Sequence, residues 1–187
     1  MAKDVYGEEE VDLIGGWHYH SLLAYGLAVY SRTSSDDKTE YALVSKGSSD
    51  FADWIHNFLQ LGNLSPDMWA SKSAAAKFAN EHPKNVITMV GHSKGGAEAL
   101  ANAYATGAFC IIFNPAEINI IEKMLSMFSY DSIKLKTYVV SGDPLAALNV
   151  LIGGINWNAI YLDSGLPAWN LVGKHGMDAV IAGLKKL

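Results

Sequence analysis

Apolar runs alternate with longer segments of helical spacing through the second half of the chain. Continuous runs of apolar or β-prone residues occupy 86–90 and 109–113, and residues 133–140 have the composition of a further strand. Between them, residues 95–106 and 117–128 carry apolar positions three and four apart, which predicts helices. Strands alternating with helices of this length predict crossover connections and a mostly parallel sheet. Helices on both faces of such a sheet explain why its strands are apolar throughout rather than at every second position.

The first half of the chain is less regular. Residues 27–33 and 40–45 predict a hairpin around a polar turn cluster. The apolar stretch 18–30 is expected to begin as a helix and end as a strand. Residues 51–61 have the spacing of a short amphipathic helix. The other expected elements are a helix starting at Ser65-Pro66 and ending near Asn80, a short strand at 159–162 and a final helix from about Met177.

Composition limits the classes of protein that this chain can belong to. With 187 residues, of which 50% are hydrophobic and 18% charged, residues 1–187 are expected to form a single folded domain. The net charge of −5, without a cluster of basic residues, argues against binding to nucleic acid. The single cysteine, Cys110, lies in an apolar run and is expected to be a buried small hydrophobe.

The N-terminal sequence carries no recognisable targeting signal. Its first ten residues are polar and acidic, unlike a secretory leader, and no stretch of about 18 apolar residues could span a membrane. We therefore expect a cytoplasmic protein without a transmembrane segment. Release by lysis or by a non-classical route remains compatible with this sequence.

The segment Gly91-His92-Ser93-Lys94-Gly95 has the pattern G-x-S-x-G between a predicted strand and an alanine-rich predicted helix. In that context the serine occupies a sharp corner, and the glycines remove the collisions that side chains would cause there. The backbone N–H of Lys94 would then lie at a helix N-terminus, where it can stabilise an oxyanion. Ser93 is predicted to be the nucleophile of a serine hydrolase. The alternative is a structural turn serine.

A serine nucleophile needs a base, and the base needs an acid that orients it. His175 is the only histidine after Ser93, and it lies in a glycine-flanked segment predicted to be a loop. Asp143 follows the predicted strand 136–140, at the sheet edge where open parallel sheets place their sites. Asp163 is the second candidate acid, and Asp143 could instead only cap a helix. This chemistry requires neither a metal nor a cofactor.

A second oxyanion donor is expected at the end of an earlier strand. The apolar strand 41–45 runs into a small, polar turn at residues 46–50. Within this turn, Ser48 could donate its backbone N–H.

Together these motifs resemble the class 3, fungal-type lipases and their small bacterial relatives. The matching segments are Gly-His-Ser-Lys-Gly-Gly, the upstream Val-Ser-Lys-Gly-Ser-Ser-Asp-Phe-Ala-Asp-Trp-Ile, the downstream Ser-Gly-Asp-Pro and the late His175. The resemblance implies an α/β-hydrolase fold, hydrolysis of carboxylic esters and a triad of Ser93, Asp143 and His175. It also implies oxyanion donors at Ser48 and Lys94. The chain departs from the family in having Lys46 for an arginine and Lys94 for a leucine.

Aromatic side chains between these motifs are candidates for substrate contacts. Trp54, Trp157 and Trp169 are predicted to contact an acyl or aromatic ester, and packing in the core is the alternative. These tryptophans would also suit a peripheral contact between the protein and a lipid surface. His18 and His20 could pair as metal ligands, but no further ligand pattern follows, and packing at a sheet edge is favoured.

The sequence therefore predicts an α/β hydrolase that acts on small-molecule or lipid esters through an acyl-enzyme. The same triad would serve a phospholipase or an acyltransferase, which the sequence does not separate. A catalytically silent binding module with the hydrolase fold is the alternative of a different class.

Overall fold

The computed structural model describes residues 2, 5, 15–23, 26–47, 66–116, 133–151 and 158–187. Its centre is a seven-stranded sheet in which the spatial order of the strands follows their order in the chain. The strands are β1 (His18–Leu23), β2 (Leu27–Thr33), β3 (Thr39–Ser45), β4 (Val86–His92), β5 (Phe109–Phe113), β6 (Leu135–Val140) and β7 (Ile160–Leu162).

The sheet is mixed, with its parallel part on the C-terminal side. β1, β2 and β3 pair antiparallel, whereas each pairing from β3 to β7 is parallel. Parallel strands place their carboxyl ends at one edge. The segments that follow β3, β4, β5 and β6 therefore all start from the same edge, where open α/β sheets carry their sites.

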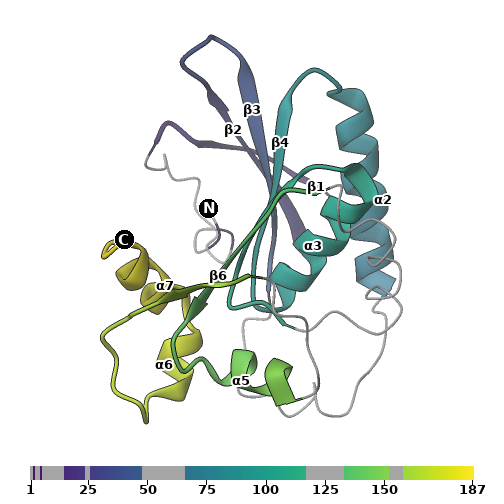
Figure 1. Cartoon of the computed structure of the whole chain (residues 1–187). Coiled ribbons are helices and arrows are strands. Elements are labelled where there is room, and N and C mark those ends of the chain that lie inside the picture. Colours follow the sequence, from purple (N-terminus) through teal and green to yellow (C-terminus); the bar gives the residue numbers. More distant parts are fainter. Residues whose placement is uncertain are drawn as a thin grey trace.

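Helices cover both faces of the sheet, as the sequence predicted. α2 (Pro66–Glu81) and α3 (Lys94–Thr106) pack on one face, and α7 (Met177–Leu184) packs on the other (Figure 1). Two further helices, α5 (Pro144–Leu151) and α6 (Leu171–His175), follow the strands at the carboxyl edge. Gly107 ends α3 in the left-handed conformation, with its N–H bonded to the Ala103 carbonyl.

The core consists of two layers, one on each face of the sheet. Along β2, Leu27 and Val29 enter the layer beneath α2 and α3, while Ala28 and Tyr30 enter the opposite layer. Full burial of a leucine or valine side chain contributes about 1.5–3 kcal/mol. Because both sides of the strand are covered, apolar residues occupy consecutive positions instead of alternating with polar ones.

Most described elements match the sequence-based expectations, with one clear exception. The predicted helical start of residues 18–30 is wrong, because residues 18–23 form the edge strand β1. Its side chains alternate between exposed and half-buried, and its backbone pairs with β2. A polar alternation of this kind suits a strand covered on one face. The helices predicted at 51–61 and 117–128 lie outside the described residues, and a single domain over 1–187 stays a prediction.

None of the helices in the described part of the chain combines the length and hydropathy needed to cross a bilayer.

Candidate active site

Ser93 occupies the sharp corner between β4 and α3. Its backbone has φ 58 and ψ −128, a region that residues other than glycine seldom adopt. The Ser93 N–H donates to the Phe113 carbonyl at 3.1 Å, and the Ser93 carbonyl accepts from Gly96 N–H at 2.9 Å and Ala116 N–H at 3.0 Å. These bonds to neighbouring elements hold the strained conformation in place.

Three glycines permit this corner by close backbone approach. A Cβ atom on Gly91 would lie 2.0 Å from the Gly95 carbonyl oxygen, and one on Gly95 would lie 2.2 Å from the Ser45 carbonyl oxygen. A Cβ on Gly96 would meet Pro115 Cβ at 3.1 Å, which is tight but within reach of a small adjustment. The predicted role of the glycines is confirmed, and Gly95 also sets the contact between the elbow and the end of β3.

Alanine substitutions at Gly95 and Gly96 should separate close backbone approach from ordinary crowding. Both residues lie in the first turn of α3, so a gain in helix propensity is shared by the two variants. We expect Gly95→Ala to lower the free energy of unfolding by about 3 kcal/mol, because β3 and the elbow must move apart. For Gly96→Ala we expect a loss of about 1 kcal/mol or less. Equal urea denaturation curves for the two variants would contradict this expectation.

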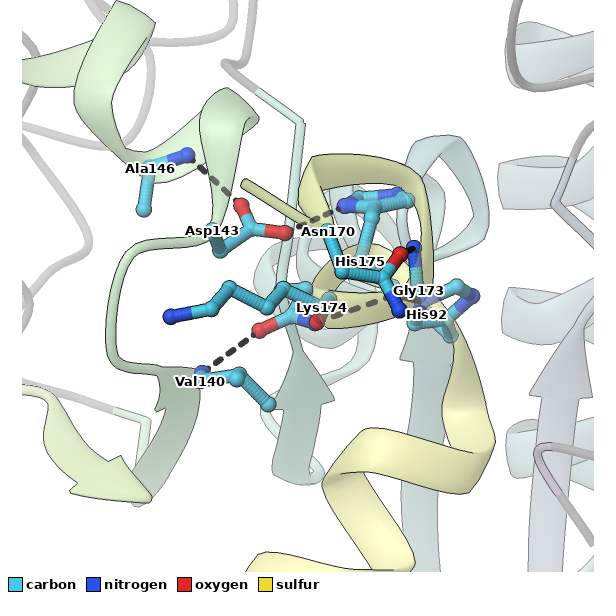
Figure 2. Close-up of polar contacts among 9 residues, drawn as sticks. His92, Val140, Asp143, Ala146, Asn170, Gly173, Lys174 and His175 are labelled. Atoms are coloured by element: carbon cyan, nitrogen blue, oxygen red, sulfur yellow. Dashed lines mark hydrogen bonds and ion pairs between the residues drawn. The ribbon is translucent and has the colours of Figure 1, made fainter. Parts of the chain in front are cut away.

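Asp143 and His175 form a buried hydrogen-bonded pair at the carboxyl edge of the sheet (Figure 2). The His175 Nδ1–H donates to Asp143 Oδ2 at 2.7 Å, and the two side chains are 3% and 0% exposed. The other carboxylate oxygen, Oδ1, accepts from the Ala146 N–H at 2.8 Å and so caps α5. The two interpretations of Asp143, helix cap and partner of a histidine, therefore hold at the same time.

The second candidate acid, Asp163, is engaged elsewhere. Its side chain is 79% exposed and accepts from the Lys186 ammonium at 3.0 Å and from the Gly165 N–H at 2.8 Å. The bond from the Gly165 N–H, followed by the contact with Lys186, lowers the pKa of this carboxyl. The structure thus pairs His175 with Asp143 and leaves Asp163 at the surface.

His175 is the last residue of a short helix, whereas the sequence predicted a loop. The helix α6 begins after Asn170, whose side chain accepts from the Gly173 N–H at 3.0 Å. A Cβ on Gly173 would lie 2.5 Å from Asn170 Oδ1, so the cap requires a glycine there. The glycine that suggested a loop is therefore part of a capped helical turn.

Two residues bind the backbone carbonyl of His175. His92, immediately before Ser93, donates its Nε2–H to this carbonyl at 2.7 Å, and Asn114 donates its amide N–H at 3.0 Å. The His92 and His175 rings lie 4.9 Å apart between centroids. Burial, and then the neighbouring His175, lower the pKa of His92 to about 4, so its ring is neutral at neutral pH.

Asn114 was not singled out from the sequence alone. The structure places Asn114 directly after β5, fully buried, with φ 39. A polar residue that follows a buried strand at the carboxyl edge is a signal that could have indicated it.

The remaining predicted site residues are only partly within the described structure. Ser48, Trp54 and Trp157 lie outside the described residues. Lys94 is the first residue of α3, and its ammonium lies 3.7 Å from the Glu98 carboxylate. Trp169 is 81% exposed and precedes α6, so the structure places it at the surface rather than in the core.

Other reactive side chains do not gather elsewhere in the described part of the chain. No group of three or more His, Cys, Asp or Glu residues within it could hold a metal ion. His18 and His20 lie on the edge strand β1, where the His20 ring packs edge-on against Tyr41. Burial raises the pKa of the Cys110 thiol, which is unsuited to nucleophilic chemistry.

The arrangement defines the class of protein. A serine at a strand–helix elbow and a carboxylate–imidazole pair, both at the carboxyl edge, are characteristic of the α/β hydrolases. Comparison with solved structures agrees with this fold. The native propeptide complex of Rhizomucor miehei lipase superposes with a TM-score of 0.60 at 14% identity, covering 86% of this chain and 65% of that one. A deletion mutant of the same complex superposes with a TM-score of 0.53 at 16% identity. That match covers 78% of this chain and 54% of the mutant's chain.

The chain belongs to the family of Tle-like phospholipase domains, whose model matches residues 2–180. It is also 34% identical over 131 residues to the extracellular phospholipase A1 of Serratia liquefaciens. That match covers 64% of this chain and 41% of the relative, so the chain spans less than half the length of that enzyme.

These comparisons confirm the lipase-like family and the α/β-hydrolase fold predicted from the sequence. They contradict the predicted cytoplasmic location, because the Serratia relative is an extracellular enzyme. The prediction failed because an acidic N-terminal segment argues against one kind of leader and carries no information on other export routes.

Proposed function

We propose that this chain is a serine phospholipase that cleaves a carboxylic ester bond of glycerophospholipids. The observation that carries the proposal is the buried 2.7 Å hydrogen bond between Asp143 and His175, beside the elbow that holds Ser93. Family membership and the phospholipase A1 relative support the choice of phospholipid over other esters.

In this mechanism His175 acts as the general base. Because its Nδ1–H is donated to Asp143, its Nε2 is the nitrogen that carries the lone pair. His175 Nε2 takes the proton of the Ser93 hydroxyl as the Ser93 oxygen attacks the ester carbonyl. The Asp143 carboxylate holds the ring in this tautomer and stabilises the imidazolium that forms.

Backbone donors stabilise the oxyanion of the tetrahedral intermediate. Lys94 opens α3, and the N–H groups in the first turn of a helix have no partners within that helix. The Lys94 N–H is the proposed first donor, and the N–H of Ser48, which follows β3 in the chain, is the proposed second donor. Such donors act where negative charge develops, and each is worth about 3 kcal/mol of transition-state stabilisation.

The reaction then proceeds through an acyl-enzyme. Collapse of the intermediate expels the lysophospholipid alcohol, which receives its proton from His175, and leaves the acyl group on Ser93. His175 next deprotonates a water molecule, which attacks the acyl-enzyme and releases the fatty acid. We propose that the Trp169 side chain, with Trp54 and Trp157, contacts lipid near this site, in keeping with the exposure of Trp169.

The name of the Serratia relative supports two finer parts of the proposal. A phospholipase A1 cleaves the ester at the first glycerol carbon, and we propose the same position here. The relative is extracellular, and we propose that this chain also meets its lipid outside the cell that makes it.

Vesicles of a phosphatidylcholine with palmitate at the first position and oleate at the second test this function. We expect the wild-type protein to release palmitate and leave the oleoyl lysophospholipid, as measured by mass spectrometry. Release of diacylglycerol would show cleavage of the phosphodiester and contradict the proposal. Hydrolysis of p-nitrophenyl esters with intact phospholipid would indicate a general esterase, and predominant release of oleate would overturn the proposed position.

A further inference from the structure

We infer that Asn114 and His92 are positioning residues, which hold the backbone of His175 so that its ring meets Asp143 and the Ser93 elbow. This inference rests on the proposed role of His175 as the base. It assigns a function to two buried side chains that lie outside the proposed triad.

Asn114 links three segments with a single side chain. Its amide nitrogen donates to the Lys174 carbonyl at 3.2 Å and to the His175 carbonyl at 3.0 Å, while its Oδ1 accepts from the Val140 N–H at 2.8 Å. The Asn114 backbone N–H also donates to the Tyr138 carbonyl at 2.9 Å. One residue therefore joins the ends of β5 and β6 to the end of α6.

The bond to Val140 connects Asn114 to the acid as well as to the base. The carbonyl of Val140 accepts from the Asp143 N–H at 2.9 Å, so the turn that carries Asp143 is built directly on the strand end that Asn114 binds. Asn114 thus sets the separation between the two segments whose side chains form the 2.7 Å bond. Misplacement of catalytic groups by about 1 Å is enough to cost about 100-fold in rate.

His92 provides the second donor to the His175 carbonyl. Its Nε2 atom lies 2.7 Å from that oxygen and donates to it, so His92 and Asn114 provide a donor for each of the two lone pairs of the carbonyl. His92 and Ser93 are adjacent in the chain, which couples the position of the base to the elbow. Both donors act on the backbone and leave the His175 ring to interact with Asp143.

The chemistry of each residue type suits this role. An asparagine amide donates and accepts at once, which neither aspartate nor leucine can do, and asparagine tolerates the left-handed backbone found at Asn114. Burial lowers the pKa of His92 to about 4, so His92 donates as a neutral ring. A second cation beside the imidazolium that forms on His175 is thereby avoided.

Two pairs of variants test the inference. Asn114→Gly removes the amide while keeping a residue that accepts positive φ, and Asn158→Gly is its control, at an exposed asparagine with φ 51. His92→Phe removes the second donor, whereas His92→Gln places an amide N–H close to the position of Nε2. Ester hydrolysis, thermal unfolding and the low-field NMR signal of the His175 Nδ1 proton are measured for each.

We expect Asn114→Gly to lower kcat by about 30- to 100-fold with KM changed by less than about threefold, because the base is displaced while the substrate site is unaltered. His92→Phe should lower kcat by about tenfold, and His92→Gln should recover most of that loss. In Asn114→Gly the low-field proton signal should shift or disappear at temperatures where the protein is fully folded. Asn158→Gly should match the wild type in all three measurements.

Unchanged kcat in folded Asn114→Gly and His92→Phe would overturn the inference, as would losses that follow only the unfolded fraction. An equal loss in His92→Gln and His92→Phe would overturn the part played by His92. If Asn114→Gly does not fold, the comparison of His92→Phe with His92→Gln decides whether the inference holds. If the wild type hydrolyses no ester, the proposed function has failed, and the proton signal then decides whether Asn114 positions the Asp143–His175 pair.

Discussion

Ser93→Ala is expected to abolish ester hydrolysis, lowering kcat by about 10⁶-fold. The hydroxyl of Ser93 is the nucleophile that attacks the ester in the proposed mechanism, and the methyl group of alanine fits the strained corner without further change. Because Ser93 and His175 act as a unit, the double variant Ser93→Ala/His175→Ala should lose little more than either single variant.

Fluorophosphonate labelling followed by intact-mass spectrometry measures this directly. The wild type should gain one adduct that maps to Ser93, and Ser93→Ala should gain none. Ser73→Ala, at an exposed serine of α2, is the control and should label and turn over like the wild type. Absence of an adduct on the wild type, together with no turnover, would instead favour a silent binding module with the hydrolase fold.

Asp143→Asn should separate the two roles of this residue. The remaining carbonyl oxygen can still accept from the Ala146 N–H and cap α5, so we expect the melting temperature to change little. An amide nitrogen facing His175 Nδ1 cannot accept its proton, which favours the wrong tautomer of the base. In a comparable triad this defect lowers kcat by about 10⁴-fold, and we expect a loss of that order.

Asp163→Asn is the matched control, because Asp163 is the other candidate acid but lies at the surface in contact with Lys186. Its kcat should equal that of the wild type. Full activity in Asp143→Asn would show that Asp143 serves only as a helix cap, and loss of activity in Asp163→Asn would show that the surface carboxylate also takes part. The comparison requires kcat and thermal unfolding to be measured on the same preparations.

The sequence indicated the central strands correctly because their signal is strong and local. Residues 27–33 and 109–113 match β2 and β5 at both ends. Each strand contains a run of consecutive apolar residues, 27–30 in β2 and 109–113 in β5, as expected where both faces of a sheet are covered. Residues 18–23 were not predicted as the strand β1, because an edge strand covered on one face has mixed polarity. The helix α6 was not predicted, because a single turn held by the Asn170 cap is too short to show helical periodicity in the sequence.

The candidate site likewise contains residues with a local sequence signal and a residue without one. Ser93, Asp143 and His175 were proposed from motifs and chain order, and the structure brings Asp143 and His175 into contact beside the elbow. Asn114 has no local motif. Its partners Val140 and His175 lie 26 and 61 residues away in the chain, so its importance becomes visible only when β5, β6 and α6 are placed in space.

The matching of strand order to chain order has a consequence for the timing of synthesis. Each new strand can join a sheet edge that is already present, so the elbow with Ser93 can form while the rest of the chain is still being translated. His175 is made 82 residues later, which at about 5–20 residues per second takes about 4–16 s. Throughout that interval the nascent chain lacks the proposed base, so the proposed lipid-cleaving site is incomplete until the last part of the chain has been made.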